Sequence, residues 1–171
     1  MDNLSNNSGE MREISIEAST MDLETGNEIS GVETRTMMRE GGEVYWNAND
    51  VLGVFTSKGE LKDFKKDNGG KVTRFTGLND VEDEFYLFYP YNEKATVDEN
   101  GIISTFLSAT QYPEPGSFYN GGSLSVSKNK EGQTAVFHQV CSYFRMSISE
   151  DYAGEITGLI FEGNDGESLA G

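Results

Sequence analysis

The chain has 171 residues, enough for one domain of ordinary size, of which 36% are hydrophobic and 11% aromatic. Its 20 glycines against 3 prolines indicate many turns between short strands and argue against a helical bundle. The net charge of −16 repels nucleic acid and anionic lipid, which excludes both as partners and favours a soluble protein in an extracellular or periplasmic setting.

The N-terminal third contains one predicted strand between two polar segments. Residues 1–12 are predicted to be a disordered linker and contain no signal-peptide pattern. We expect that any targeting segment has been removed. Residues 13–18 alternate polar and apolar side chains, which predicts a first strand that buries Ile14, Ile16 and Ala18 on one face. Residues 19–43 form a long polar connection, and connections of this length tend to be functional or mobile.

The middle of the chain carries the most apolar segments. Residues 43–55 predict a strand, a turn at 47–50 and a second strand, and residues 57–70 predict a hairpin-like excursion before a short strand at 72–75. In residues 84–92 six of nine side chains are aromatic or aliphatic. That composition predicts a strand buried on both faces, which turns abruptly at its Tyr-Pro-Tyr-Asn end.

Glycine-containing turns separate the strands expected in the second half. Asn100-Gly101 predicts the turn of a hairpin over 97–103, because glycine adopts the left-handed conformation that such a turn needs. A turn at 129–132 separates two further short strands, 124–127 and 134–137, which follow a loop at 108–123.

The C-terminal end also alternates apolar and polar residues. Phe144, Met146 and Ile148 predict a half-exposed strand over 144–149. Residues 155–163 predict another strand, followed by a tight turn and a short returning strand. Around ten short strands, with no helical segment of ten residues or more, predict an all-β sandwich.

No residue pattern predicts catalysis, a cofactor or a metal. Cys141 and His138 lie three apart, so on one strand they face opposite sides and cannot form a nucleophilic dyad. The single cysteine excludes an intrachain disulfide, and one histidine with one cysteine cannot build a zinc site. Asp98 and Glu99 favour a plain turn over a metal site, and no loop has calcium-ligand spacing. Because Asp and Glu are abundant, a pair of carboxylates that would hydrolyse glycosides remains an alternative.

Aromatic residues leave two interpretations open. Trp46 with Tyr45, Tyr86 and Tyr89 would form a sugar-stacking platform if exposed, or part of the core if buried. The core is favoured, because all four belong to predicted strands.

The order of several motifs resembles the fimbrillin family, the surface fimbrial subunits of Bacteroides-type bacteria. Residues 44–55 look like that family's Trp-x-x-x-Asp-x-Ile-Gly-Val-Phe block, and residues 85–91 match its Tyr-Pro-Tyr strand. The other motifs are Thr34-Arg35-Thr36 before the first hairpin, Gln111 with Gly116-Ser117-Phe118, the strand from Phe137-His138 to Met146, and the end from Ile156 to Gly171. Together they span about residues 13–171, and their order is more specific than any one of them.

This resemblance implies a transthyretin-like Greek-key β-sandwich of about 7–10 short strands with long loops, as the N-terminal domain over 13–171. It implies a structural, non-enzymatic subunit of a fimbria or pilus at the cell outer membrane, exported as a lipoprotein and supporting cell adhesion. Subunits would assemble with other fimbrial subunits by donor-strand exchange, which makes Ile14, Ile16 and Ala18 the candidate exchangeable strand. Arg35 and Arg39, in the connection after it, are the candidate processing sites.

Two features of the family pattern are absent from this chain. The sequence does not include the second, C-terminal sandwich domain, so we expect either that this chain is the N-terminal domain of a longer protein or that it is a short member of the family. No lipoprotein cysteine lies near the start, so membrane attachment is expected only through a lipid anchor outside the sequence. The alternative function is a tip adhesin that binds surface glycan or host protein through exposed aromatic residues and the 108–123 loop.

Overall fold

The protein is an all-β molecule. The computed structural model describes residues 10–20, 37–38, 44–46, 49–66, 73–80, 84–113, 118–119, 121–144, 146–152, 154–167 and 169, which form strands and no helix. The strands are β1 (Arg12–Thr20), β2 (Met37–Met38), β3 (Val44–Tyr45), β4 (Val51–Phe55), β5 (Leu61–Lys66), β6 (Thr73–Asn79), β7 (Phe85–Tyr89), β8 (Thr96–Val97), β9 (Ile103–Ser104), β10 (Ser125–Asn129) and β11 (Ala135–Gln139).

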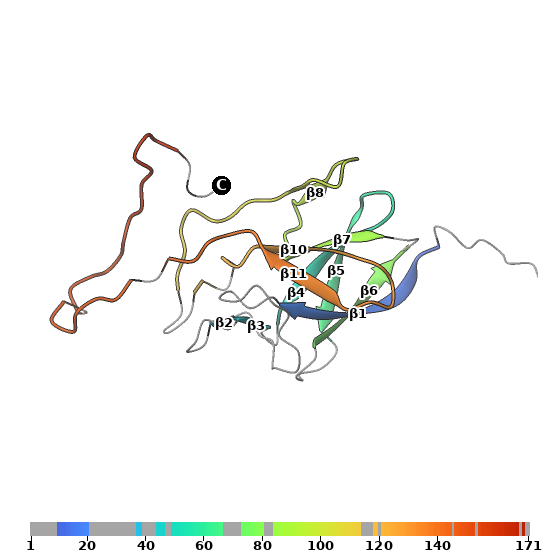
Figure 1. The fold of residues 1–171 in the computed structure, drawn as a ribbon, viewed down its shortest axis with the longest axis horizontal. Coiled ribbons are helices and arrows are strands. Elements are labelled where there is room, and N and C mark those ends of the chain that lie inside the picture. The colour runs from blue at the N-terminus through green and yellow to red at the C-terminus, as the bar shows by residue number, and fades with distance from the viewer. Residues whose placement is uncertain are drawn as a thin grey trace, which may run out of the picture.

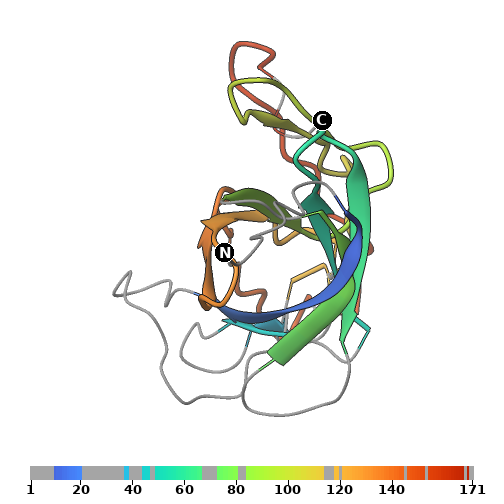
Figure 2. The same ribbon diagram turned by 90° about the vertical axis from the view of Figure 1, so that its right-hand side faces the viewer.

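Seven of these strands form one sheet that closes into a barrel (Figure 1), in the order β1-β11-β10-β7-β4-β5-β6 and back to β1. The ring of strands is visible from its end in Figure 2. Neighbours in the barrel run antiparallel except β1 and β11, which are parallel. Closure gives every strand of this sheet two neighbouring strands, and the pairs β2–β3 and β8–β9 are separate small sheets.

The barrel is filled by one aromatic-rich core. Trp46 is fully buried, and its ring meets Phe75, Tyr89 and Phe137 edge-on with centroid separations of 5.3, 5.0 and 5.2 Å. Edge-to-face packing of this kind adds to the stabilisation that burial itself provides. The core interpretation of Trp46 is therefore confirmed, and a sugar platform that includes its ring is wrong. The remaining core side chains are Ile14, Ile16, Ala18, Leu52, Val54, Phe64, Phe85, Leu87 and Ala135.

Strand β7 is buried on both faces, as its sequence predicts. Phe85, Leu87 and Tyr89 belong to the barrel core. Phe88 points the other way and stacks on Phe55 at 5.6 Å between centroids, in a second cluster with Ala95 and side chains of β8 and β9. Because successive strand side chains alternate between faces, one strand serves both clusters.

The two predicted glycine turns are present. Gly101 joins β8 to β9 at φ 79° and Gly132 joins β10 to β11 at φ 80°, both in the left-handed region that glycine adopts without steric cost. The Tyr89–Pro90 peptide bond at the end of β7 is cis.

The strands expected over 144–149 and 155–163 are wrong for the residues described there. That part of the chain contains turns but no ladder, although the tight turn at Asn164–Gly166 forms. After β11 the chain runs away from the barrel (Figure 1). Its apolar side chains find no neighbouring strand, and without partner hydrogen bonds the alternation does not produce a β-strand.

Candidate functional site

Strand β1 is the candidate exchangeable strand, and its side chains form part of the barrel wall. Ile14, Ile16 and Ala18 point into the core and are buried, whereas Glu13 and Ser15 are exposed and Glu17 is half-buried. The alternation predicted from the sequence is therefore the alternation of the folded strand.

The two neighbours of β1 hold it unequally. Against β6 the register extends antiparallel over seven pairs, from Arg12 with Asn79 to Ala18 with Thr73. Against β11 it is parallel and covers three pairs, beginning only where Ala18 meets Ala135. The barrel is thus closed by a short parallel seam, and the first six residues of β1 have a registered partner on one side.

Side chains add surface contacts along the β1–β6 pair. Arg74 donates to Glu17 at 3.2 Å, and the Ser15 and Thr76 hydroxyl oxygens lie 3.1 Å apart. Arg12 pairs with Glu131 in the turn after β10. These ion pairs are exposed, so each is expected to stabilise the strand by less than about 1 kcal/mol.

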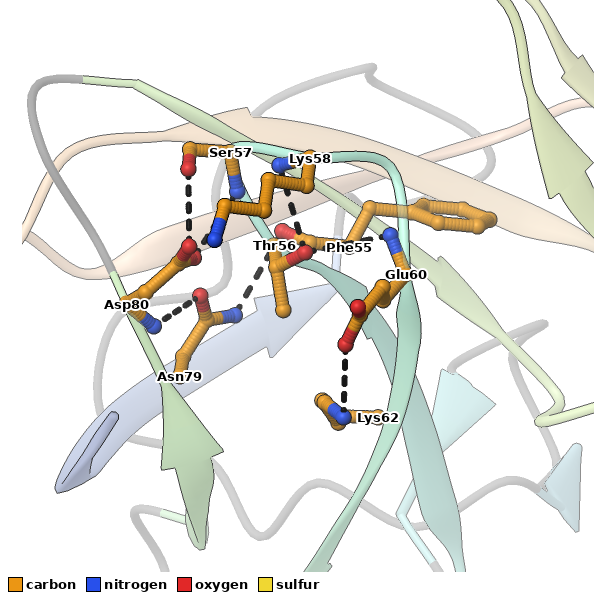
Figure 3. Close-up of polar contacts among 8 residues, drawn as sticks. All are labelled: Phe55, Thr56, Ser57, Lys58, Glu60, Lys62, Asn79 and Asp80. Carbon is orange, nitrogen blue, oxygen red and sulfur yellow. Dashed lines mark hydrogen bonds and ion pairs between the residues drawn. The ribbon is translucent and has the colours of Figure 1, made fainter. Parts of the chain in front are cut away.

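A polar clamp formed by Asn79, Asp80, Ser57 and Phe55 fixes the end of β6 beside the start of β1 (Figure 3). The Asp80 carboxylate accepts hydrogen bonds from the Ser57 amide at 2.9 Å and the Ser57 hydroxyl at 2.8 Å. Asn79 Nδ2 donates to the Phe55 carbonyl at 3.4 Å, and Asn79 Oδ1 accepts from the Asp80 amide at 2.7 Å. Burial raises the pKa of Asp80, but the hydrogen bonds from Ser57, the bond from its own amide and the Lys58 charge together outweigh it, so the pKa lies below its ordinary value.

The turn to which the clamp is attached is itself well bonded. Thr56 Oγ1 accepts from the amides of Lys58 at 3.3 Å and Glu60 at 3.0 Å, and the Thr56 amide donates to the Glu60 carbonyl at 2.8 Å (Figure 3). The register of β6 with β5 covers two pairs, at Phe75 and Thr76 in the middle of β6. The clamp therefore holds the end of β6 through contacts that do not involve β1.

The candidate processing sites Arg35 and Arg39 lie outside the described residues, and they stay predictions. The clamp was missed by sequence reasoning. Its only sequence signal is the Asn79-Asp80 pair at the end of a strand, which also fits an ordinary turn.

The residues weighed for chemistry occupy other places. His138 is exposed on β11, and Cys141 follows that strand, where burial raises the pKa of its thiol and opposes a nucleophilic thiolate. Asp98 accepts hydrogen bonds from the Asn100 amide at 2.9 Å and the Ile102 amide at 2.8 Å, the arrangement of a turn. In the described part of the chain no three potential metal-ligating side chains come together.

Comparisons of the chain with protein-family models, with curated proteins and with solved structures find no match. Among the described residues no helix is long and apolar enough to cross a membrane. A proposal for function therefore depends on the motif order in the sequence and on the geometry of β1.

Proposed function

We propose that this chain is a structural, non-enzymatic subunit of a bacterial surface fimbria, which assembles with other subunits by exchange of its first strand. The observation that supports it best is the unequal pairing of β1. This strand places Ile14, Ile16 and Ala18 in the core, yet its contact with β11 is a parallel seam of three residue pairs.

Removal of β1 would leave an acceptor groove that suits another strand. The groove would lack three core side chains, of which Ile14 and Ile16 each contribute about 2 kcal/mol by burial. The facing backbone groups of β6 would lose their hydrogen-bond partners. A donor strand with alternating apolar side chains restores both, which is the principle of strand addition to a sheet.

The clamp supports the same proposal from the other side of the groove. Because Asp80 and Asn79 fasten the end of β6 to the β4–β5 turn, the groove edge keeps its place without β1. An edge that stays ordered reduces the entropy that an incoming strand must overcome.

The wider biological setting rests on the resemblance to fimbrillins. In this proposal the subunit lies at the cell surface, attached to the outer membrane by a lipid anchor, and supports adhesion within a homo- or heteropolymer. Its domain is a transthyretin-like Greek-key sandwich to which a second, C-terminal domain belongs, and cleavage after Arg35 or Arg39 releases β1.

The experiment compares the full chain with one that lacks residues 1–35. A synthetic peptide of residues 12–20 serves as donor, and the same peptide with Ile14→Asp and Ile16→Asp serves as the matched control. The shortened chain should polymerise or bind the first peptide and reject the second. A shortened, folded chain that stays monomeric and binds neither peptide would contradict the proposal.

A tip adhesin that binds glycan is the second candidate, favoured by Tyr112, which is 74% exposed in the 108–113 loop. An exposed aromatic ring offers a face on which a sugar can stack. A glycan array probed with the chain and its Tyr112→Ala variant separates the candidates, since the fimbrial shaft proposal predicts no glycan signal from either.

A further inference from the structure

The smallest core-facing residue of β1 is also its most enclosed one. Ala18 pairs on one side with Thr73 of β6 and on the other side with Ala135 of β11. Both neighbours are fully buried, and Ala18 itself is 2% exposed. Side chains opposite each other on one face of a sheet have Cβ atoms about 5 Å apart, so three short side chains form a row across three strands here.

The other two core-facing residues of β1 have more room beside them. Ile14 lies opposite Gly77, which has no side chain, and Ile16 lies opposite Phe75. Neither isoleucine has a registered partner on β11. The groove that β1 fills is therefore wide at its first two core positions and narrow at the position of Ala18.

The Trp46 ring crosses β1 at the level of Ala18. On the β6 side Phe75 is in register with the residue two positions before Ala18, and on the β11 side Phe137 is in register with the residue two positions after it. The Trp46 ring packs edge-on against both phenylalanine rings, with centroid separations of 5.3 and 5.2 Å. Because β1 lies between β6 and β11 in the barrel (Figure 1), a ring that contacts both phenylalanines passes over Ala18.

The ring over Ala18 is held in place by its surroundings. Trp46 is fully buried and also meets Tyr89 edge-on at 5.0 Å, so three aromatic rings contact it. Added methylene groups in a closely packed interior displace side chains and reduce stability. A side chain longer than that of alanine at position 18 would have to displace the Trp46 ring.

We infer that position 18 determines which strands the β1 groove accepts. A strand in this place runs antiparallel to β6, carries large apolar residues at the positions of Ile14 and Ile16, and has a side chain no larger than alanine at the position of Ala18. For a donor strand from another subunit the inference rests on the proposed function, since it defines the partner of the groove. For the chain's own β1 it applies without any exchange.

This large-x-large-x-small pattern is more selective than alternation alone. Residues 144–148 also carry apolar side chains at every second position, namely Phe144, Met146 and Ile148. In either register that places two of these side chains in the wide part of the groove, position 18 would receive Ile148 or Glu150. The groove therefore rejects this segment by a clash or a buried charge at one position, which is discrimination against a wrong partner.

The first test measures uptake of fluorescent peptides of residues 12–20 by the full chain, at a urea concentration below its unfolding midpoint. The Ala18→Leu peptide should bind about tenfold or more weakly than the parent peptide, because it overpacks the core. The matched control is the Ser15→Leu peptide, which adds a leucine at an exposed position of the same strand and should bind as the parent does. A peptide of residues 142–150 should not bind. Equal uptake of the Ala18→Leu and parent peptides would overturn the inference.

The second test needs no strand exchange. In the full chain, Ala18→Leu should raise the unfolding equilibrium constant about tenfold or more, whereas Ser15→Leu should change it by less than about threefold. In a chain that carries Trp46→Leu the effect of Ala18→Leu should shrink, because the new side chain fills space that the ring has left. In a chain that carries Phe88→Leu, in the second cluster, the effect should keep its full size.

The two tests separate the inference from the proposed function. A full chain that takes up no peptide contradicts strand exchange, and the unfolding measurements then decide whether position 18 requires a small side chain. Equal effects of Ala18→Leu and Ser15→Leu, or an Ala18→Leu effect that Trp46→Leu leaves unchanged, would overturn the inference. If one of these chains does not fold, Ala18→Val and Trp46→Phe provide the same comparison with smaller changes in volume.

Discussion

The barrel and the segment that follows it contain the same sequence pattern in two different states. In β1 apolar residues at alternate positions face a common core and pair with β6 and β11. In residues 144–148 apolar residues also alternate, but Phe144, Met146 and Ile148 stay exposed and the residues described there form no strand. Alternation therefore specifies which side of an extended chain is apolar, and a neighbouring strand decides whether a sheet forms.

This difference implies that single substitutions should have very unequal effects in the two regions. A side chain in the barrel is surrounded by others that cannot close up around a void, whereas one in the C-terminal segment is largely in contact with water.

Trp46→Ala should produce the largest loss, about 3 to 5 kcal/mol in the free energy of unfolding, because it leaves a void between Phe75, Tyr89 and Phe137. Urea denaturation measures it. Phe161→Ala, the matched change in the exposed segment, should alter the same quantity by less than about 0.5 kcal/mol. Equal losses would show that the two regions share one core.

Gly53→Ala should cost about 1 to 3 kcal/mol, because an added Cβ would collide with the Phe88 ring that covers this glycine. Gly158→Ala is the matched control, since nothing lies within 4 Å of a Cβ built there. Thermal unfolding should show a lower midpoint for the first variant. A midpoint unchanged by Gly53→Ala would contradict the close approach of β4 and β7.

Asp80→Asn should reduce stability by about 1 kcal/mol near neutral pH, because it leaves Ser57 one neutral acceptor oxygen and replaces the other acceptor with an NH2 donor. The pKa of Asp80 lies below its ordinary value of 3.8, so the carboxylate stabilises the fold above that pH and loses this effect as pH falls through the lower pKa. Denaturation at several pH values should show the parent and the variant converging in acid. A difference independent of pH would exclude the carboxylate as its source.

Ending the chain after Phe144 should have the smallest effect, less than about 0.5 kcal/mol, since Tyr143 and its contacts with Phe118 and Ser123 are retained. The comparison is made at concentrations at which the full chain is monomeric. A large loss would mean that residues 146–169 contribute to barrel stability.

Much of the barrel could be predicted from local patterns. Residues 13–18, the aromatic run that became β7 and the turns at Gly101 and Gly132 all form as the sequence indicates, because their determinants lie within a few residues. The closure of the barrel could not be predicted. It depends on Ala18 meeting Ala135, a contact between distant parts of the chain for which neither segment carries a local signal.

The candidate site was predictable to a similar degree. Alternation predicts which β1 side chains enter the core, but not that the β11 seam is short or that Asp80 reaches Ser57 across a separate turn. The strand predictions over 144–149 and 155–163 were wrong because periodicity carries no information about whether a partner strand is present.

The central claim is that β1 can leave a barrel that otherwise stays folded, and native-state hydrogen exchange tests it most directly. The amides of residues 12–18 should exchange through an opening of lower free energy than global unfolding, whereas those of β4 and β7 should exchange only when the whole barrel unfolds. If β1 and β7 share one opening free energy and one dependence on denaturant, β1 is an inseparable part of the barrel and the account is contradicted.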